Sequence, residues 1–261
     1  MNKIHPSSII SPKAIIGNNL NIGPYCIIGE DVEIGNGTEL ISNVNISGNT
    51  KIGKNNVFHP FSSIGSAPQD LKYKGEKSNL IIGNENVFRE HVTVNLGTKG
   101  GGMLTTIGNK CLLMVGVHIA HDCIIKNNVV FANNATLAGH ISIDDNCVIG
   151  GLSAIHQFVR IGKYAMIGGM SGVEQDIIPY GLYTGIRSHL RGLNIIGLKR
   201  KGMDSKKIKQ LKNIYSIIFD TKNPLTINLK KINDISNDEY EEIKKFILSK
   251  SIRGICTPKY V

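Results

Sequence analysis

Apolar residues recur every six positions along most of the chain. The series runs without a break from Ile4 to Ile64, returns from Ile82 to Val94, and continues from Ile107 to Val173. Neither the helical period of 3.6 nor the alternation by two of an ordinary strand produces this spacing. A six-residue unit corresponds to one short strand and a bend, and three such units close a triangular coil of about 18 residues. The pattern therefore predicts a mainly β, parallel β-helix of hexapeptide repeats.

The coils must stack, because so short a strand cannot bury its apolar face alone. Successive coils are expected about 4.8 Å apart, and the number of repeats predicts about nine or ten coils. Eleven of the periodic apolar residues are followed by glycine, which we expect to supply permissive backbone angles at the corners. Two stretches, near 69–80 and 95–106, break the register and contain Lys72-Tyr73-Lys74-Gly75 and Gly100-Gly101-Gly102. We expect them to be loops that leave the coils, where binding residues often lie.

The period of six ends after Val173, and the C-terminal part of the chain has helical spacing. Apolar residues at Ile208, Leu211 and Ile214 are typical of an amphipathic helix. We expect three or so helices from about Gly192 onward, covering the open end of the stack. The predicted domains are thus a β-helix over 1–186 and an α-helical C-terminal domain over 187–261.

The composition fits this division and locates the charge. The chain has 261 residues, 29 of them glycine, no tryptophan and 6% aromatic residues, so the core must be largely aliphatic. The net charge is +10, yet 1–186 holds 13 basic and 13 acidic residues, whereas 187–261 holds 17 and 7. The helical domain is therefore expected to meet an acidic protein at Lys199-Arg200-Lys201. The domain lacks the aromatic residues that alternate with basic ones in nucleic-acid-binding segments, so we do not expect it to bind nucleic acid. The alternative to a protein partner is that the basic residues form a solvated helix face.

The cysteines and the apolar segments indicate a cytoplasmic protein. The five cysteines are widely spaced, odd in number and contain no C-x-x-C pair, which suggests neither disulfides nor a thiolate zinc site. The N-terminus does not resemble a secretory signal, and no apolar run is long enough for an integral membrane segment.

A column of polar positions marks a candidate site. His121, Gly139 and Gln157 are spaced by 18 residues, so they should occupy equivalent places on three successive coils. His121 lies two residues after Ile119 of the apolar series, and hence at or near a corner. Asp122 could orient His121 only if the backbone bends there, because consecutive residues of a strand point to opposite faces.

Three other interpretations are weaker. His118-x-x-His121 could be half of a metal site, but beyond His140 or Cys123 no third ligand is obvious, so we expect no metal. A metal-dependent hydratase on the same fold would need three histidines at a subunit interface. A purely structural solenoid would explain the hexapeptides but not the polar column.

Several motifs resemble one family. Together with the hexapeptides they are similar to the acyl-carrier-protein:UDP-N-acetylglucosamine O-acyltransferases, over nearly the whole chain and least closely after about Gly202. The motifs are His118-Ile-Ala-His121-Asp122-Cys, Asn133-Asn-Ala-Thr-Leu-Ala-Gly-His140, Asp70-Leu-Lys72-Tyr, Ile155-His-Gln157-Phe and Gly197-Leu-Lys-Arg200.

The resemblance implies an architecture and a reaction. It implies a left-handed coil and a homotrimer with active sites between neighbouring β-helices. It further implies transfer of a (3R)-hydroxyacyl chain from acyl carrier protein to the 3-hydroxyl of UDP-N-acetylglucosamine, the first step of lipid A biosynthesis. The donor is carried by the phosphopantetheine of the carrier protein, and no cofactor is bound to the enzyme itself.

The resemblance also implies roles for individual residues. His121 corresponds to the general base, Asp122 to the carboxylate that orients it, and the Gly139 N–H to the oxyanion donor. Gly169 corresponds to the position that limits acyl length, and its lack of a side chain implies an acyl group nearer fourteen carbons than ten. Substrate-binding positions are Asp70, Lys72, His118, His140, His156 and Gln157, and those for the donor's phosphopantetheine and carrier are Asn194 and Arg200.

Some positions depart from the family's pattern. Ile186, Arg187 and Ile196 stand where familiar members carry polar or acidic residues that contact the nucleotide. Some relatives accept a 3-amino sugar and form an amide, and the sequence leaves that alternative open.

Overall fold

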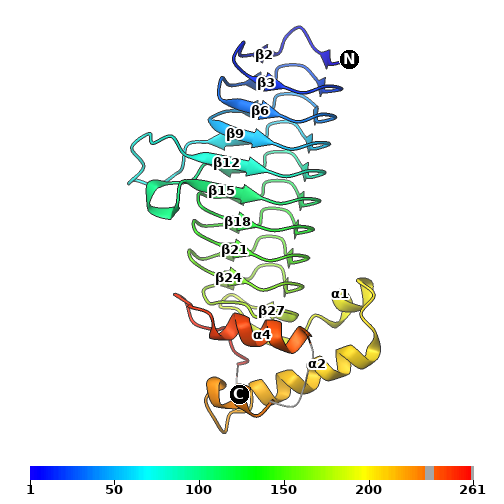
Figure 1. Ribbon diagram of the computed structural model, residues 1–261, viewed down its shortest axis with the longest axis vertical. Helices are drawn as coiled ribbons and strands as arrows, with labels where there is room; N and C mark the ends of the chain where they lie inside the picture. The colour runs from blue at the N-terminus through cyan, green and yellow to red at the C-terminus, as the bar shows by residue number, and fades with distance from the viewer. Residues whose placement is uncertain (233–237, 260–261) are drawn as a thin grey trace.

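The chain forms a long left-handed parallel β-helix with helices at its C-terminal end (Figure 1). The structure is a computed structural model and describes residues 1–232 and 238–259. Three parallel sheets, here called A, B and C, form the three sides of the prism, and the chain visits them in that order in every coil. The fold predicted from the period of six is therefore confirmed.

The short strands are distributed evenly over the three sheets. Sheet A contains β1 (Lys3–Ile4), β4 (Asn21–Ile22), β7 (Glu39–Leu40), β10 (Val57–Phe58), β13 (Val87–Phe88), β16 (Leu112–Leu113), β19 (Val130–Phe131), β22 (Val148–Ile149), β25 (Met166–Ile167), β27 (Gly181–Thr184) and β28 (His189–Leu193). Sheet B contains β2 (Ile9–Ile10), β5 (Ile27–Ile28), β8 (Asn45–Ile46), β11 (Ser63–Ser66), β14 (Thr93–Asn95), β17 (His118–Ile119), β20 (Thr136–Leu137), β23 (Ala154–Ile155) and β26 (Gly172–Val173). Sheet C contains β3 (Ile15–Ile16), β6 (Val32–Ile34), β9 (Asn49–Ile52), β12 (Asn79–Ile82), β15 (Leu104–Ile107), β18 (Ile124–Ile125), β21 (Ser142–Ile143) and β24 (Arg160–Ile161).

The strand register follows the 18-residue repeat. Ile28 lies opposite Ile46 on the next coil, and His118 lies opposite Thr136. The two interruptions lengthen the step, since Ile64 lies opposite Val94, and Val94 opposite Ile119. The last coil shortens it, since Met166 lies opposite Leu182. The additional residues form loops over 67–78 and 96–103, the second containing a short 3-10 helix, Lys99–Gly101. The loops fall where the period is broken, but the expected ranges 69–80 and 95–106 run into β12, β14 and β15. Both loops leave the prism at the corner between sheets B and C, the B/C corner.

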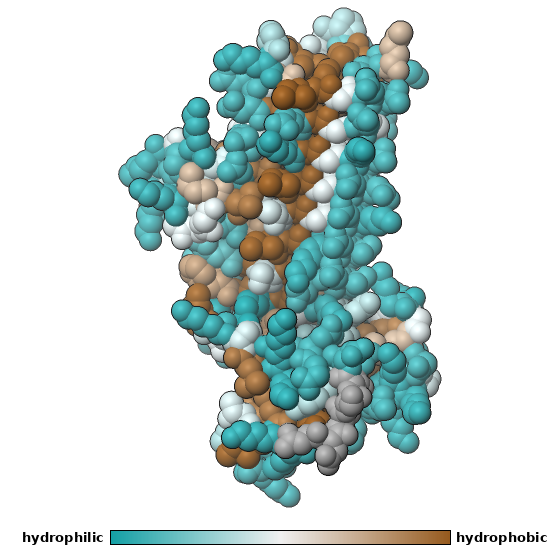
Figure 2. Space-filling view, in the orientation of Figure 1, coloured by the Kyte–Doolittle hydropathy of each residue, from teal (hydrophilic) through white to brown (hydrophobic). Residues whose placement is uncertain are grey.

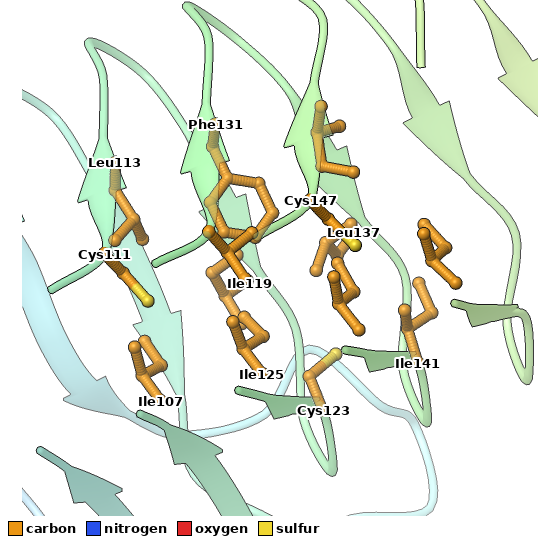
Figure 3. Close-up of a cluster of buried hydrophobic side chains, with 14 of the residues drawn as sticks. Ile107, Cys111, Leu113, Ile119, Cys123, Ile125, Phe131, Leu137, Ile141 and Cys147 are labelled. Carbon is orange, nitrogen blue, oxygen red and sulfur yellow. The ribbon is translucent and has the colours of Figure 1, made fainter. Parts of the chain in front are cut away.

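The periodic apolar residues form the core. From Ile22 to Val173 every member of the series is buried, whereas Ile4 is exposed and Ile10 and Ile16 are half-buried, because no coil lies above the first one. Figure 3 shows the packing of part of this core, in which Cys111, Cys123 and Cys147 lie among the apolar side chains. All five cysteines are free and buried, and burial raises the pKa of Cys111 to about 11 and that of Cys123 to about 12.

The glycines that directly follow residues of the apolar series do not supply the backbone angles predicted for the corners. Of those eleven, only Gly65 has a positive φ, and the left-handed conformation lies two residues later, for example at Asn19, Tyr25 and Asn55. The glycines are needed instead because the coils approach closely at these points. A Cβ on Gly23 would lie 1.8 Å from a backbone oxygen of the next coil.

Among the described residues, four helices cover the C-terminal end of the stack, α1 (Ile195–Arg200), α2 (Ser205–Ile218), α3 (Leu225–Lys230) and α4 (Asp238–Leu248). The helical prediction is therefore confirmed with one helix more than expected. Strands β27 and β28 form an antiparallel hairpin before α1, and residues 186 and 187 lie in its turn. None of the described helices is both long enough and apolar enough to cross a membrane.

Candidate active site

The centre of the site is a buried pair of consecutive residues at the B/C corner. The Nδ1 of His121 lies 2.8 Å from Oδ2 of Asp122. Asp122 has φ +58°, so the local bend that the sequence analysis required is present. Because a carboxylate only accepts hydrogen bonds, the proton of the neutral imidazole is on Nδ1, which leaves Nε2 with a free lone pair. The geometry therefore makes His121 Nε2 a base.

The loop over 96–103 holds the Asp122 carboxylate in place. Thr98 donates twice, from its backbone N–H to Oδ1 at 2.9 Å and from its hydroxyl to Oδ2 at 2.6 Å. The Asp122 side chain is completely buried. A Cβ on Gly101 would lie within 2.5 Å of three Asp122 side-chain atoms, so only glycine allows the loop to close so tightly over the carboxylate.

Gly139 lies next to His121 on the following coil, as the spacing of 18 predicts. A Cβ at this position would be 2.6 Å from His121 Nε2 and 2.4 Å from Cε1. The absence of a side chain therefore brings the backbone of Gly139 against the edge of the imidazole that carries the free lone pair. Within the part of the chain that the structure describes, the Gly139 N–H has no hydrogen-bond acceptor, so it is available to a substrate oxygen.

Two further histidines flank the pair. The ring of His140 lies edge-on to His121, with centroids 4.9 Å apart, and stacks on Phe158 at 4.5 Å. His118 shares a 2.7 Å hydrogen bond with the Thr93 hydroxyl. Burial lowers the pKa of His118, and the neighbouring His121 adds to that shift. Burial also lowers the pKa of His140, although the Asp122 carboxylate opposes it. Both shifts favour neutral rings beside His121.

The two loops and the corner residues enclose a cleft of about 450 Å³. Asp70 and Lys72, from the first loop, line it together with His140 and Phe158. The Lys72 N–H donates to Asp70 Oδ1 at 2.9 Å, which fixes the turn. The structure thus brings the Asp-Leu-Lys-Tyr loop to His140, the neighbour of His121, as a shared substrate site requires.

The other predicted residues do not line this cleft, although His156 and Gln157 share the B/C corner with it. His156 and Gln157 are exposed on the coil after Gly139. Gly169 lies at the corner between sheets A and B, the A/B corner. The side-chain amide of Asn194 donates to the Tyr164 carbonyl at 2.9 Å, and its oxygen caps α1 by accepting from the Gly197 N–H. Arg200 ends α1. These positions do not share one cleft within a single protomer.

The described residues contain one group of side chains that could hold a metal ion, consisting of His121, Asp122 and His140. Their ligand atoms lie within 4.8 Å of one another, so His140 and not His118 would accompany His121. The carboxylate oxygens already accept bonds from Thr98 and His121, however, and a metal would have to replace them. Cys123, the other suggested ligand, is buried in the core.

Sequence reasoning missed Thr98, Phe158 and Arg253. Thr98 reaches Asp122 through a loop, and Arg253 reaches Gln157 from a segment 96 residues later in the chain, so no periodicity could indicate either contact. The only sequence signal for the Thr98 contact was the run of glycines at 100–102, of which Gly101 lies close against Asp122.

Fold and site together define an acyltransferase of the hexapeptide-repeat class. Residues 104–139 match the family model described as "Bacterial transferase hexapeptide (six repeats)", and residues 176–256 match "Udp N-acetylglucosamine O-acyltransferase; Domain 2". The chain belongs to the family of acyl-[acyl-carrier-protein]–UDP-N-acetylglucosamine O-acyltransferases.

The similarity to members of that family covers almost the whole chain. The chain is 47% identical to the member from Aliarcobacter butzleri over 256 residues, which is 98% of each protein. It is 48% identical to that of Nautilia profundicola over 205 residues, 78% of this chain and 79% of the relative. A crystal structure of a UDP-N-acetylglucosamine acyltransferase has a TM-score of 0.94 at 44% identity, with coverage of 99% and 100%. The UDP-N-acetylglucosamine acyltransferase from Campylobacter jejuni has a TM-score of 0.93 at 36% identity, with coverage of 98% and 100%.

Proposed function

We propose that this chain transfers a (3R)-hydroxyacyl group from acyl carrier protein to the 3-hydroxyl of UDP-N-acetylglucosamine, the first step of lipid A biosynthesis. The observation that carries the proposal is the buried His121–Asp122 pair beside the side-chain-free backbone of Gly139. The near full-length similarity to enzymes named for this reaction supports it.

The geometry supports a direct transfer. His121 Nε2 takes the proton of the sugar 3-hydroxyl while the hydroxyl oxygen attacks the thioester carbonyl. The Gly139 N–H donates to the oxyanion that forms, and Asp122 stabilises the imidazolium. Collapse of the tetrahedral intermediate breaks the carbon–sulfur bond, and the phosphopantetheine thiolate takes the proton from His121. Atoms and charges balance without a bound cofactor or metal.

The spread of site residues over the prism supports a homotrimer. Gly169 is at the A/B corner and His121 at the B/C corner, so a neighbouring protomer is needed to join acyl and sugar sites. Large exposed apolar residues occur at the A/B corner and on the outer face of sheet C, namely Tyr25, Phe61, Leu152 and Met170 at the corner and Ile15, Ile81 and Ile124 on the sheet. Figure 2 shows an apolar band running along the prism. When two different surfaces of one protein bind each other head to tail, the subunits form a closed ring if the rotation between neighbours permits it.

The helical end is the proposed docking site of the acidic carrier protein. Residues 187–261 carry 17 basic and 7 acidic residues, and Lys199, Arg200 and Lys201 end or follow α1. Asn194 and Arg200 would then contact the donor's phosphopantetheine and carrier. We accordingly treat 1–186 and 187–261 as two domains with separate tasks, and we expect the enzyme in the cytoplasm, where buried free cysteines remain reduced.

The test is a transfer assay with purified protein, using carrier-linked 3-hydroxyacyl donors of several lengths and either UDP-N-acetylglucosamine or its 3-amino analogue. We expect ester formation with the hydroxy sugar and preference for the longer donors. Amide formation alone would assign the amino sugar instead. Absence of transfer together with stoichiometric zinc in the purified protein would favour the hydratase alternative.

A further inference from the structure

A segment at the C-terminal end of the chain returns to the last coil and is firmly anchored there. The Asp176 N–H donates to the Gly254 carbonyl and the Cys256 N–H to the Asp176 carbonyl, both at 2.8 Å, so residues 254–256 continue sheet pairing beyond the last hexapeptide. The Asp176 side chain is fully buried and accepts from Arg160 Nε at 2.8 Å and from its NH2 group at 2.7 Å. The position of the preceding residue, Arg253, is therefore fixed by the fold.

Arg253 contacts two residues of the candidate site at the B/C corner. Its Nε donates to the Gln157 carbonyl at 2.7 Å, and its terminal NH2 group donates to Nδ1 of His156. The Nδ1 of His156 also lies 3.4 Å from the Gln157 carbonyl oxygen. That oxygen already accepts the shorter hydrogen bond from Arg253 Nε, at 2.7 Å. The guanidinium thus bridges the His156 ring and the main chain of the next residue, Gln157.

The chemistry of this contact decides where the proton of His156 lies. A guanidinium has only donors, so Nδ1 of His156 must be an acceptor and the ring proton must be on Nε2. His121 has the opposite arrangement, because its Nδ1 donates to the Asp122 carboxylate. One imidazole therefore offers a lone pair at Nε2, and the other offers a hydrogen-bond donor at the same ring position.

We propose that Arg253 is a positioning residue that holds His156 in its Nε2–H form, so that His156 donates a hydrogen bond to an oxygen of the UDP-sugar. This inference rests on the proposed function for the identity of the ligand, but the state of His156 does not depend on it. Arg253 itself does not touch the reacting atoms. It acts through His156 and the Gln157 main chain.

The first test is spectroscopic and needs no substrate. In protein labelled with 15N-histidine, long-range 1H–15N correlation spectra report the tautomer of each ring, and His156 is identified by the signal lost in His156→Asn. We expect the Nε2–H tautomer in the unsubstituted protein and a mixture of tautomers in Arg253→Ala. An Nδ1–H ring in the unsubstituted protein, or an unchanged His156 signal in Arg253→Ala, would overturn the proposal.

The second test separates binding from turnover. We expect Arg253→Ala to raise the KM for UDP-N-acetylglucosamine roughly 10-fold or more, the usual effect of losing a charge-assisted hydrogen bond, with kcat within about twofold. Arg253→Lys should recover part of the loss, and Lys250→Ala, which removes a positive charge three residues earlier in the chain, should have little effect. A fall in kcat with unchanged KM, or an equal effect of Lys250→Ala, would contradict the positioning role. If the unsubstituted protein transfers no acyl group, the proposed function fails while the tautomer measurement still decides the role of Arg253.

Discussion

At the scale of single residues, the site consists of imidazoles whose roles are set by their hydrogen-bond partners. A carboxylate fixes His121 with its lone pair at Nε2, and Thr98 in turn fixes that carboxylate. Gly139 then brings backbone, and no side chain, to the same nitrogen. Asp122 therefore acts on the reaction through its neighbour and not by contact with the substrate.

The substitution Asp122→Asn tests this positioning directly. An amide group can donate to His121 Nδ1, which would move the ring proton to Nε2 and remove the base. We expect kcat to fall roughly 100-fold or more, as is typical when acid–base catalysis is lost, with the KM for both substrates nearly unchanged. Thr98→Val should give a smaller loss of kcat. Activity within a few-fold of normal in Asp122→Asn would show that the carboxylate does not set the tautomer.

His118 gives a prediction about pH and stability. Its folded pKa is lowered from the ordinary value of 6.5, mainly by burial. Below that value the unfolded chain binds a proton that the folded chain does not, so stability is full above about pH 6.5 and falls as the pH falls further. We expect His118→Gln to flatten this dependence by up to about 1.4 kcal/mol per pH unit, measured by denaturant unfolding at pH 7.5 and 5.5. The same slope in both proteins would contradict the shift.

At the scale of elements, the sequence predicted the repeated parts of the fold far better than the contacts between loops and coils. A period of six aligns the apolar residues in a column, which only the stacking of coils can bury. The breaks in the period gave the places of both loops. The left-handed corners were not predictable from residue type, because Asn19, Tyr25 and Glu85 all adopt the same positive φ. The sense of the coil came from the family resemblance. Contacts such as Thr98 to Asp122 depend on how a loop folds back, which periodicity does not encode.

The helix α1 and the residues after it are the element expected to bind the carrier protein. Reversing charge in Lys199→Glu or Lys201→Glu should raise the KM for acyl carrier protein roughly 10-fold, with a weaker dependence on salt, because each removes a favourable long-range interaction. Acyl-pantetheine, which lacks the protein, should be used equally well by the variant and the original enzyme. The control is Lys3→Glu, at the far end of the prism. A comparable effect in Lys3→Glu would argue against a local docking surface.

At the scale of the whole molecule, the prism separates the proposed sugar and acyl positions. His121 and Gly169 lie at different corners, and exposed apolar side chains lie at the A/B corner and on the outer face of sheet C. A homotrimer in which each A/B corner meets a neighbour's B/C corner would complete three sites at once. The active unit would then be the assembly and not the single chain.

The substitution of Leu152 and Met170, both more than 60% exposed at the A/B corner, tests the assembly. A buried carboxylate at a subunit interface is costly, so Leu152→Asp with Met170→Asp should shift the mass in light scattering from trimer to monomer and abolish transfer. Circular dichroism should remain unchanged, because both side chains point away from the core. A trimer of normal activity would exclude this corner from the interface.

The central claim is that His121 is the base of an acyl transfer. The most direct measurement is the single-turnover rate of acyl transfer by His121→Ala, compared with His5→Ala, which changes an exposed histidine at the other end of the chain. We predict a loss of roughly 1000-fold or more for His121→Ala, with the oligomer intact, and a normal rate for His5→Ala. A rate for His121→Ala within a few-fold of the original enzyme would contradict the mechanism.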